Sequence, residues 1–181
     1  MRSFGYIILV LFTVCLLAGC GDMFEPRTMT ASDGSSSLKI PSSWGRDSGL
    51  NQEAKLCVSN RVRELYICVI SENKEDLHRM SLNRYSRLSR GFILNRMKSH
   101  RVSKAERFKI NGMSAVRYQM QGAVENINVV YLHTTVESAK YYHQIFGWTL
   151  KSRRKRNVPI LKKVIATFRE GADKKKEAKK S

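Results

Sequence analysis

Apolar and polar positions alternate along parts of this chain in a way that predicts β-strands. The pattern is clear at residues 38–40, and residues 65–70 are apolar at both parities. A strand that is apolar on both sides is covered on both faces, so residues 65–70 predict a sheet with layers on each side. Residues 55–59 form a second strand in this interpretation, joined to residues 65–70 as a hairpin through a turn at residues 60–64.

Four further strands follow in the second half of the chain. Asn111-Gly112 is a strong turn signal for a hairpin between the first two of them. Residues 127–136 are the longest β-prone run in the sequence. The pattern therefore predicts an antiparallel meander with strands at residues 105–110, 114–121, 127–136 and 140–149.

A helical period predicts one helix between these groups of strands. Asn73 is suited to an N-cap, and Glu75 and Asp76 would complement the helix dipole in the first turn. We expect a helix over residues 74–90, and a continuation to Met97 stays open. Its sheet-facing positions are expected to be Leu77, Ser81, Tyr85, Leu88 and Phe92.

A second helix is predicted near the C-terminus. Asn157 is placed as its N-cap, and Pro159 suits the first helical position. The apolar positions that follow form one stripe of an amphipathic helix, which should pack on the sheet. These positions are Ile160, Leu161, Val164, Ile165 and Phe168.

The N-terminal apolar run, residues 4–16, is short for a membrane-spanning helix and ends in Leu17-Ala18-Gly19-Cys20. These four residues resemble the lipobox of bacterial lipoproteins, which implies acylation of Cys20 and cleavage just before it. An ordinary signal peptide or an uncleaved anchor would also be apolar, but neither requires a cysteine at that position. In the sorting rule of that family, the lack of an Asp directly after the cysteine favours the outer membrane over the inner membrane.

The chain is accordingly divided into four parts. Residues 1–19 are the expected signal peptide, and residues 20–37 are the lipidated cysteine and a flexible tether without an apolar period. Residues 38–170 form one domain, a size that leaves little room for a second. Residues 171–181 are rich in lysine and are expected to be a basic disordered tail.

Two cysteines remain within the domain, Cys57 and Cys68. A turn centred between Val62 and Arg63 places them opposite one another on the hairpin, within the Cα separation that a disulfide requires. Outside the cytoplasm such a pair is a candidate disulfide, and two buried unpaired thiols are the alternative. Their spacing is not that of a redox or zinc motif, so both readings are structural.

The charge is strongly positive, with 33 Lys and Arg against 15 Asp and Glu. Residues 140–169 contain no acidic residue, and residues 79–117 contain only Glu106. A solvated basic surface is the plainer interpretation, and a surface for anionic lipids, acidic envelope polymers or an acidic protein is the functional one. The expected secretion signal argues against nucleic acid as a partner. The candidate anion-binding residues are Lys151, Arg153, Arg154, Lys155, Arg156, Lys162 and Lys163.

Catalytic and metal-binding patterns are weak in this sequence. His133 and His143 could approach one another across a turn, but only Glu137 lies near enough in sequence to complete a metal site. The sequence lacks a Gly-x-Ser-x-Gly elbow, a His-Glu-x-x-His pair and a glycine-rich phosphate loop. We therefore expect no catalytic residue, metal or cofactor, and a protein that is not an enzyme.

The order of elements resembles the PsbP-like family. The resemblance is carried by LKIPSSW, INGMSAVRYQMQG, NINVVYLHTT, YYHQIFGWTLKS and VPILKKVIATF, within residues 38–169. That family includes bacterial lipoproteins of the DcrB type and a nuclear-transport factor that binds the Ran GTPase. The resemblance implies an α+β fold, an antiparallel sheet flanked by helices on both faces in a PsbP-like α/β/α sandwich. It has no shared motif from which a functional residue could be transferred.

The sequence as a whole favours a non-catalytic envelope lipoprotein, held to a membrane by lipid and facing the periplasm. Its expected role is that of a binding or adaptor module for another envelope protein. The alternative is electrostatic binding of anionic lipids or acidic polysaccharides through the basic surface. The adaptor role predicts an exposed apolar or aromatic patch beside the basic surface, whereas the alternative predicts binding that weakens steeply with salt.

Overall fold

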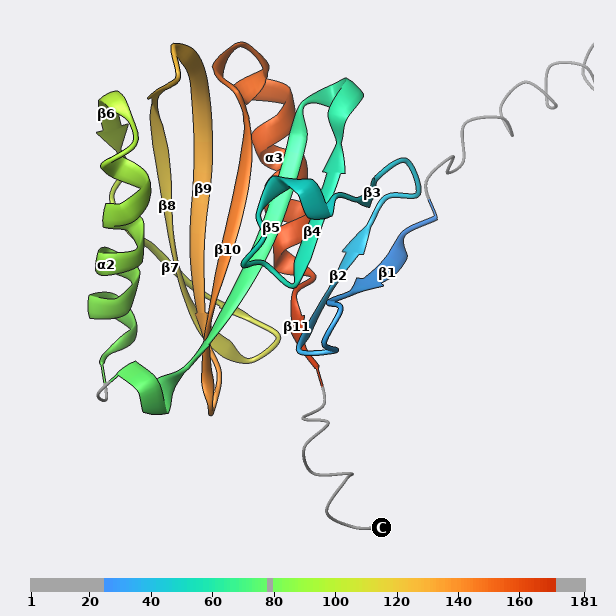
Figure 1. Cartoon of the computed structure of the whole chain (residues 1–181), viewed down its shortest axis with the longest axis vertical. Helices are drawn as coiled ribbons and strands as arrows, with labels where there is room; N and C mark the ends of the chain where they lie inside the picture. Colours follow the sequence, from blue (N-terminus) through green and yellow to red (C-terminus); the bar gives the residue numbers. More distant parts are fainter. Residues whose placement is uncertain (1–24, 78–79, 172–181) are drawn as a thin grey trace, which may run out of the picture.

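An eight-stranded antiparallel sheet forms the body of the molecule (Figure 1). The structure is a computed structural model that describes residues 25–77 and 80–171. The strand order is β3-β4-β5-β10-β9-β8-β6, and β7 also pairs with β8. The strands are β3 (Gly45–Arg46), β4 (Leu56–Asn60), β5 (Leu65–Asn73), β6 (Lys98–Val102), β7 (Glu106–Ile110), β8 (Met113–Val124), β9 (Ile127–Glu137) and β10 (Tyr141–Leu150).

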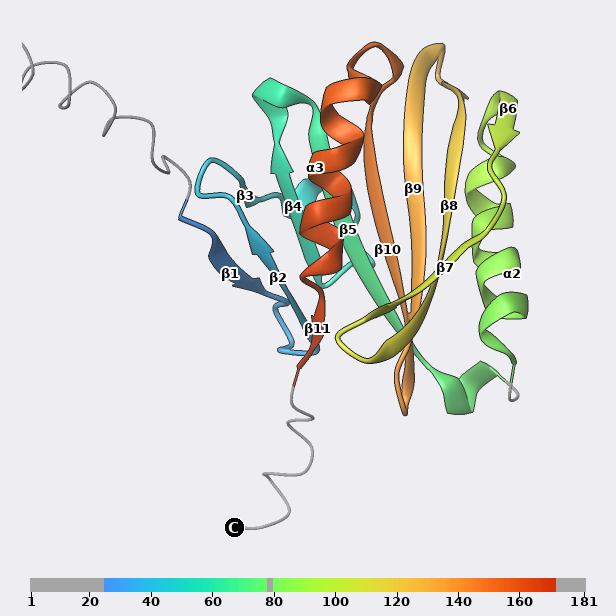
Figure 2. The same cartoon turned by 180° about the vertical axis from the view of Figure 1, so that it is seen from behind.

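The two long helices, α2 (Leu82–Leu94) and α3 (Arg154–Ala166), cover opposite faces of this sheet (Figures 1 and 2). Two residues of β10 that point to opposite faces of the sheet show this directly. A Cβ at Gly147 would contact Leu161 and Ile165 of α3, whereas Gln144 donates a hydrogen bond to the hydroxyl of Tyr85 on α2. The predicted α+β fold with helices on both faces is therefore confirmed.

The main core lies between α3 and the sheet. Leu161, Ile165 and Phe168 have no exposed surface, and they pack with the inward-facing residues of β5, β9 and β10. Burial of side chains of this size contributes about 1.5–3 kcal/mol each. The apolar stripe predicted for the C-terminal helix is confirmed in these residues.

A small second sheet contains β1 (Arg27–Thr30), β2 (Ser36–Ile40) and β11 (Arg169–Glu170). The flexible tether expected over residues 20–37 therefore differs from the structure, in which β1 and the start of β2 lie within the described part of that stretch. The cause is pairing with β2 together with packing by Met29 and Ala31 on the main core. The short, polar β1 has no apolar alternation by which it could be recognised.

The hairpin and the meander follow the predicted pattern. In β4 and β5, Cys57 lies opposite Cys68, which is the predicted register. Strands β7 to β10 match the four predicted runs within a few residues. Strand β6 was not predicted because its side chains are all exposed and it lacks an apolar face.

The prediction that the first helix begins after Asn73 was wrong. Residues Lys74–Leu77 form only the 3-10 turn η3, and α2 begins after Ser81, whose hydroxyl accepts a hydrogen bond from the backbone N–H of Arg84. Asn73 instead accepts a hydrogen bond from the backbone N–H of Glu75. A polar side chain that satisfies a local turn competes with a helix cap, and here the turn is the outcome.

The face that α2 presents to the sheet is also rotated from the predicted one. Tyr85, Ser86 and Ser89 are buried, whereas Leu88 and Phe92 are 50% and 74% exposed. The two small serines let the helix approach the sheet closely, and Ser89 lies 3.2 Å from Nε2 of His133. Two large apolar side chains are left at the edge of the helix as a result.

Helix α3 begins earlier than predicted. After the turn η4 (Lys151–Arg153), the helix starts at Arg154, so Asn157 lies inside the helix and does not cap it. The amide of Asn157 is buried and donates hydrogen bonds to the carbonyl of Arg63 at 2.7 Å and to the hydroxyl of Thr149 at 2.8 Å. These tertiary partners, which the local sequence does not reveal, replace the predicted capping role.

Candidate functional site

The two domain cysteines form the disulfide Cys57–Cys68, with their Cα atoms 4.1 Å apart. Both residues are buried where β4 pairs with β5. The bridge closes a short hairpin, so its role is structural, and the alternative of two free thiols is excluded. Cys20, the predicted site of lipidation, and residues 172–181 of the predicted tail lie outside the described residues.

The predicted anion-binding residues divide into two groups. Lys151, Arg153, Arg154, Lys155 and Arg156 lie together in η4 and the first turn of α3. Lys162 and Lys163 lie further along α3, and Nζ of Lys162 is 3.0 Å from Oε2 of Glu106. Because Lys162 already has an acidic partner, the first group is the stronger candidate for an external anion.

The 3-10 turn η2 (Arg61–Arg63) adds two arginines to the first group. Arg153 donates a hydrogen bond to the carbonyl of Val62 at 3.5 Å, and Asn157 donates one to the carbonyl of Arg63. Arg61 forms two bonds of 2.8 Å with the carboxylate of Asp47, which offsets its charge. We call this surface the basic end. It consists of Arg61, Arg63, Lys151, Arg153, Arg154, Lys155 and Arg156.

The exposed edge of α2 forms a second surface. Residues 84, 88 and 92 are spaced by four positions, so Arg84, Leu88 and Phe92 follow one edge of the helix. Arg96 comes next, in the turn after the helix. Burial raises the pKa of Tyr131, and the positive charge of Arg96 partly opposes this rise. We call Arg84, Leu88, Phe92 and Arg96 the α2 surface, and the described part of α2 contains no acidic residue.

The α2 surface borders a part of the sheet that no helix covers. Tyr85, next to Leu88 and Phe92 on the helix circumference, bonds to β10, whereas Arg90 on the other side lies over the ring of Tyr118 in β8. Leu88 and Phe92 are therefore on the β10 side of the helix. Figure 1 shows β10 and β5 beyond that side, between α2 and the loop that leads into β4.

Three aromatic rings stack side by side on this open part of the sheet. Trp148 of β10 lies between Tyr66 of β5 and Tyr131 of β9, with ring centroids 5.2 Å and 5.7 Å apart. All three are half-buried. The spacing matches that of neighbouring strands, so the three rings form a row across β5, β10 and β9 on this face of the sheet.

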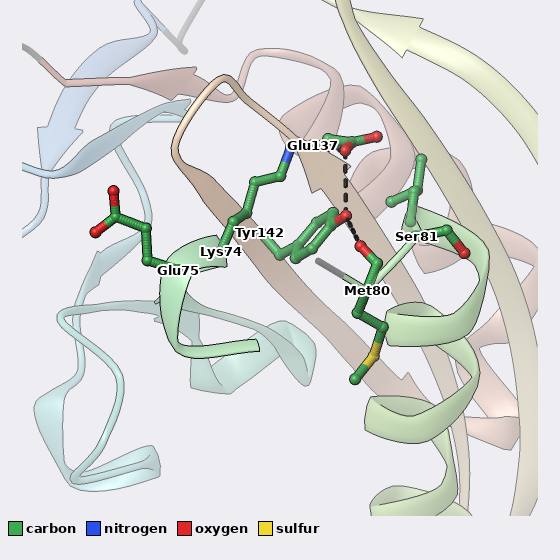
Figure 3. Close-up of a pocket in the computed structure, with 7 residues that line it drawn as sticks. Lys74, Glu75, Met80, Ser81, Glu137 and Tyr142 are labelled. Carbon is green, nitrogen blue, oxygen red and sulfur yellow. Dashed lines mark hydrogen bonds and ion pairs between the residues drawn. The ribbon is translucent and has the colours of Figure 1, made fainter. Parts of the chain in front are cut away.

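A hollow of about 860 Å³ lies beside the turn from β9 to β10 (Figure 3). Tyr142 pairs with Glu137 there, at the end of the two strands opposite to the basic end. Nζ of Lys74 is 2.7 Å from the carboxylate of Glu137, and it lies 5.1 Å above the ring of Tyr142. The Tyr142 hydroxyl is 2.5 Å from the Met80 carbonyl and 3.1 Å from Glu137. Burial, with the adjacent carboxylate, raises the pKa of Tyr142 to about 12.

The groups in this hollow satisfy one another. The lysine is paired with the carboxylate, and the tyrosine is protonated at neutral pH and can donate its proton only to the carbonyl or to the carboxylate. Glu75 points away from the other side chains in Figure 3. The arrangement holds the segment before α2 against β10, and it presents neither an activated nucleophile nor an unpaired base.

His133 and His143 do not approach one another as the sequence suggested. His133 lies under α2 and His143 lies on the α3 face, because the two residues have opposite parity relative to the paired strands β9 and β10. Within residues 25–77 and 80–171, no group of three or more His, Cys, Asp or Glu side chains could hold a metal ion.

Ser71, His143 and Glu170 lie in the order of a hydrolase triad. The Ser71 hydroxyl is 2.8 Å from Nδ1 of His143, and the Glu170 carboxylate is 3.4 Å from Nε2. Burial lowers the pKa of His143, and the carboxylate opposes this shift. None of the three residues lines the hollow beside Tyr142 or the smaller one beside Cys57. The group therefore joins β5, β10 and β11 without a visible substrate site.

Among the described residues, no helix is long and apolar enough to cross a membrane. No protein-family model matches the chain, and no curated protein matches its sequence.

Solved structures of other proteins share this arrangement. The cyanobacterial PsbP of Synechocystis sp. PCC 6803, CyanoP, superposes with a TM-score of 0.59 at 11% identity, over 84% of this chain and 96% of that chain. The chain has the PsbP-like fold. LpqN of Mycobacterium tuberculosis gives a TM-score of 0.55 at 10% identity, over 83% of this chain and 92% of its own.

The Ran-binding protein Mog1p of Saccharomyces cerevisiae also has this PsbP-like fold, with a TM-score of 0.55 at 10% identity. The similarity covers 81% of this chain and 95% of that chain. Identities this low show a shared fold, and function has to be argued from the surfaces of this chain.

Two parts of the candidate surfaces could not be found in the sequence. Arg61 and Arg63 lie about 90 residues from the basic run that they join, and the only local signal was a turn. Leu88 and Phe92 were recognised as apolar positions of a helix but were assigned to its buried face. Their exposure depends on the close packing of Ser86 and Ser89.

Proposed function

We propose that this protein is a membrane-anchored envelope lipoprotein that acts as a non-catalytic binding or adaptor module for another envelope protein. The lipobox ending at Cys20 supports the anchor and the compartment. A disulfide between Cys57 and Cys68 agrees with an oxidising compartment. LpqN, which shares the fold, is described as involved in cell envelope biogenesis.

The observation that carries the proposed role is the α2 surface. Leu88 and Phe92 are 50% and 74% exposed, and they lie one helical turn apart beside an uncovered part of the sheet. Single exposed apolar residues are common, but an adjacent pair next to a row of aromatic rings is typical of an interaction surface. Aromatic side chains at the centre of such surfaces often contribute most of the binding energy.

The charges of the α2 surface indicate what kind of partner fits it. Arg84 and Arg96 flank the two apolar side chains, and no carboxylate offsets them on α2. A partner with one or two apolar side chains between acidic residues would complement this pattern. We therefore expect an acidic protein surface or helix as the partner.

Site-specific photo-crosslinking in intact cells tests this role. A photo-crosslinking amino acid in place of Phe92 should yield one dominant adduct with another envelope protein. The same amino acid at Ser114, an exposed residue of β8 just after the turn from β7, should not. Leu88→Ser combined with Arg84→Gln should reduce the Phe92 adduct at least tenfold, since an apolar contact and a complementary charge are both lost.

Lys109→Gln with Ser114→Ala is the matched control, because it also removes one cation and changes one exposed side chain. This control should keep the adduct at the level of the unsubstituted protein. Adducts of equal yield at residues 92 and 114, or no protein adduct at residue 92, would contradict the adaptor role.

A second candidate function is electrostatic binding of anionic lipids or acidic envelope polymers. It is favoured by the basic end, where Lys151, Arg154 and Lys155 have no ion pair within the described residues. Binding of this kind should weaken steeply between low and high salt. It can coexist with a protein partner because it uses different residues.

A further inference from the structure

Several turns meet at the basic end, and two of them expose an apolar side chain. Val62 lies in η2 between β4 and β5 and is 85% exposed. Ile127 lies at the turn from β8 to β9 and is 55% exposed. The antiparallel pairing puts both turns at the same end of the sheet, on either side of η4, as the upper end of Figure 1 shows. We call Val62 and Ile127 the apolar tips.

The charge around the apolar tips is mainly positive. The basic end lies beside and between them, and Lys98 at the start of β6 adds a cation near the turn that leads to Ile127. The acids at this end are Asp47, which is paired with Arg61, Glu64, which accepts a hydrogen bond from the Tyr66 hydroxyl, and the exposed Glu125. The cations of the basic end outnumber these carboxylates.

The two loops of the basic end are held rigidly. Asn60 caps η2 by accepting a hydrogen bond from the backbone N–H of Arg63, and Asn157 ties the same turn to α3. Val62 is therefore exposed on an ordered turn, with its carbonyl bonded to Arg153. An ordered apolar tip loses little conformational entropy when it enters another phase.

The N-terminal part of the chain also reaches the fold on this side. Arg27 at the start of β1 donates a 2.5 Å hydrogen bond to the carbonyl of Trp44, and Asn60 beside η2 donates one to Ser43. Only four residues lie between Cys20 and Glu25, and the five residue-to-residue steps of a fully extended chain span at most about 18 Å. A lipid on Cys20 would keep this side of the domain close to the bilayer.

We infer that the basic end rests on an anionic lipid bilayer, with the apolar tips in the headgroup region and the surrounding Lys and Arg side chains on lipid phosphates. This inference rests on the membrane anchor of the proposed function but not on its protein partner. Polybasic surfaces bind an anionic leaflet more tightly than a neutral one because the opposite charges attract. Apolar side chains among the basic residues add binding free energy by entering the boundary between headgroups and acyl chains.

Depth-dependent quenching tests this orientation on the full chain reconstituted into vesicles. An environment-sensitive fluorescent amino acid replaces Val62, Ile127 or, as the control position, Ser114. In vesicles of phosphatidylglycerol and phosphatidylcholine that contain brominated lipid, the probes at 62 and 127 should be quenched at least twofold more than the probe at 114. In vesicles of phosphatidylcholine alone, the difference should disappear.

Neutral substitutions test whether membrane contact depends on the charges of the basic end or only on the net charge of the protein. Each basic residue near an anionic surface favours membrane contact about fivefold. Arg154→Gln with Lys155→Gln should therefore lower the ratio of molecules whose basic end contacts the bilayer to those whose basic end does not by about 25-fold. Lys104→Gln with Lys109→Gln removes the same charge from exposed positions outside the candidate anion-binding residues and should change this ratio little. Unfolding curves of both pairs check that the domain stays folded.

Three results would overturn the inference. These are equal quenching at 62 and 114, quenching that persists in phosphatidylcholine alone, and equal effects of the two substitution pairs. A probe at 62 that responds to soluble dextran sulfate but to no vesicle would assign the basic end to acidic polymers instead. Loss of the Phe92 adduct in cells would leave the quenching result unchanged, because the two experiments probe different residues.

Discussion

At the scale of single residues, His133 is unusual because an ionisable ring lies in the space between α2 and the sheet. It has no exposed surface, its Nε2 is 3.2 Å from the Ser89 hydroxyl, and its Nδ1 has no hydrogen-bond partner within the described residues. Burial, together with the charge of Arg90, lowers the pKa of His133 from 6.5 to about 4. The folded protein therefore holds this ring neutral down to mildly acidic pH.

The free energy of unfolding should consequently fall as the pH falls from about 6.5 to about 4. In that range the unfolded chain binds a proton on this imidazole and the folded chain does not, so protonation favours unfolding. The full effect of the shift is about 3 kcal/mol. His133→Leu should flatten the pH dependence measured by urea unfolding at pH 7 and pH 4.5, although the variant is also less stable at pH 7.

His100→Leu is the matched control, since His100 is exposed on β6. Because this ring is exposed in the folded protein, His100→Leu should change the pH dependence less than His133→Leu does. The buried His143 has a pKa shifted in the same direction, so His133→Leu should remove only part of the dependence. A pH dependence that is the same in all three proteins would show that His133 titrates normally in the fold.

At the scale of elements, the start of α3 connects two loops through one side chain. Asn157→Ala leaves the carbonyl of Arg63 and the hydroxyl of Thr149 without this donor. Unsatisfied buried polar groups cost about 1–3 kcal/mol, so the variant should lose about that much unfolding free energy in urea. Asn128→Ala, at an exposed position of β9, is the control and should change it by less than about 0.5 kcal/mol.

The same variant should also free the turn η2. Hydrogen exchange of the Arg63 and Glu64 amides should be faster in Asn157→Ala than in the control, because η2 loses its tie to α3. Unchanged exchange at η2, together with unchanged stability, would mean that Asn157 does not support the basic end.

The outcomes for α2, α3 and the hairpin show what local patterns can predict. The hairpin register followed from strand period and turn length alone, because a one-residue slip would move every side chain to the other face. The starts of both helices were misplaced because Asn73 and Asn157 are good caps in isolation but have better partners here, the Glu75 amide and the Arg63 carbonyl. The polar β1 and β6 are strands only through their neighbours.

At the scale of the whole molecule, the sequence predicted the class of fold, the β4–β5 hairpin and the meander from β7 to β10, but not the pairing of β5 with β10 that joins them. It also predicted a basic run, but not that η2 and η4 would form one surface, since their contact depends on the tertiary fold. The aromatic row has the same origin, because Tyr66, Tyr131 and Trp148 belong to three separate strands. Sequence patterns identified the side chains, and only the topology brings them together.

The length of chain between the expected anchor at Cys20 and the start of the fold should determine how often the basic end contacts the bilayer. A flexible insertion of 20 Gly and Ser residues between Cys20 and Glu25 would extend this segment from five residue-to-residue steps to about five times that number. The effective concentration of the basic end at the bilayer falls roughly as the −3/2 power of tether length, which is about tenfold here. Quenching of the probe at Val62 should fall accordingly, most clearly at a salt concentration where contact is incomplete.

The same insertion placed after Lys180 is the control and should leave the quenching unchanged, because it does not lie between the anchor and the domain. Cross-linking at Phe92 should respond less to the N-terminal insertion, since the α2 surface binds a protein and does not depend on the local lipid surface. Quenching at Val62 that is indifferent to tether length would mean that the basic end is brought to the membrane by something other than the N-terminal lipid. If the short tether holds the basic end and the apolar tips at the bilayer, quenching at Val62 must depend on the length of that tether.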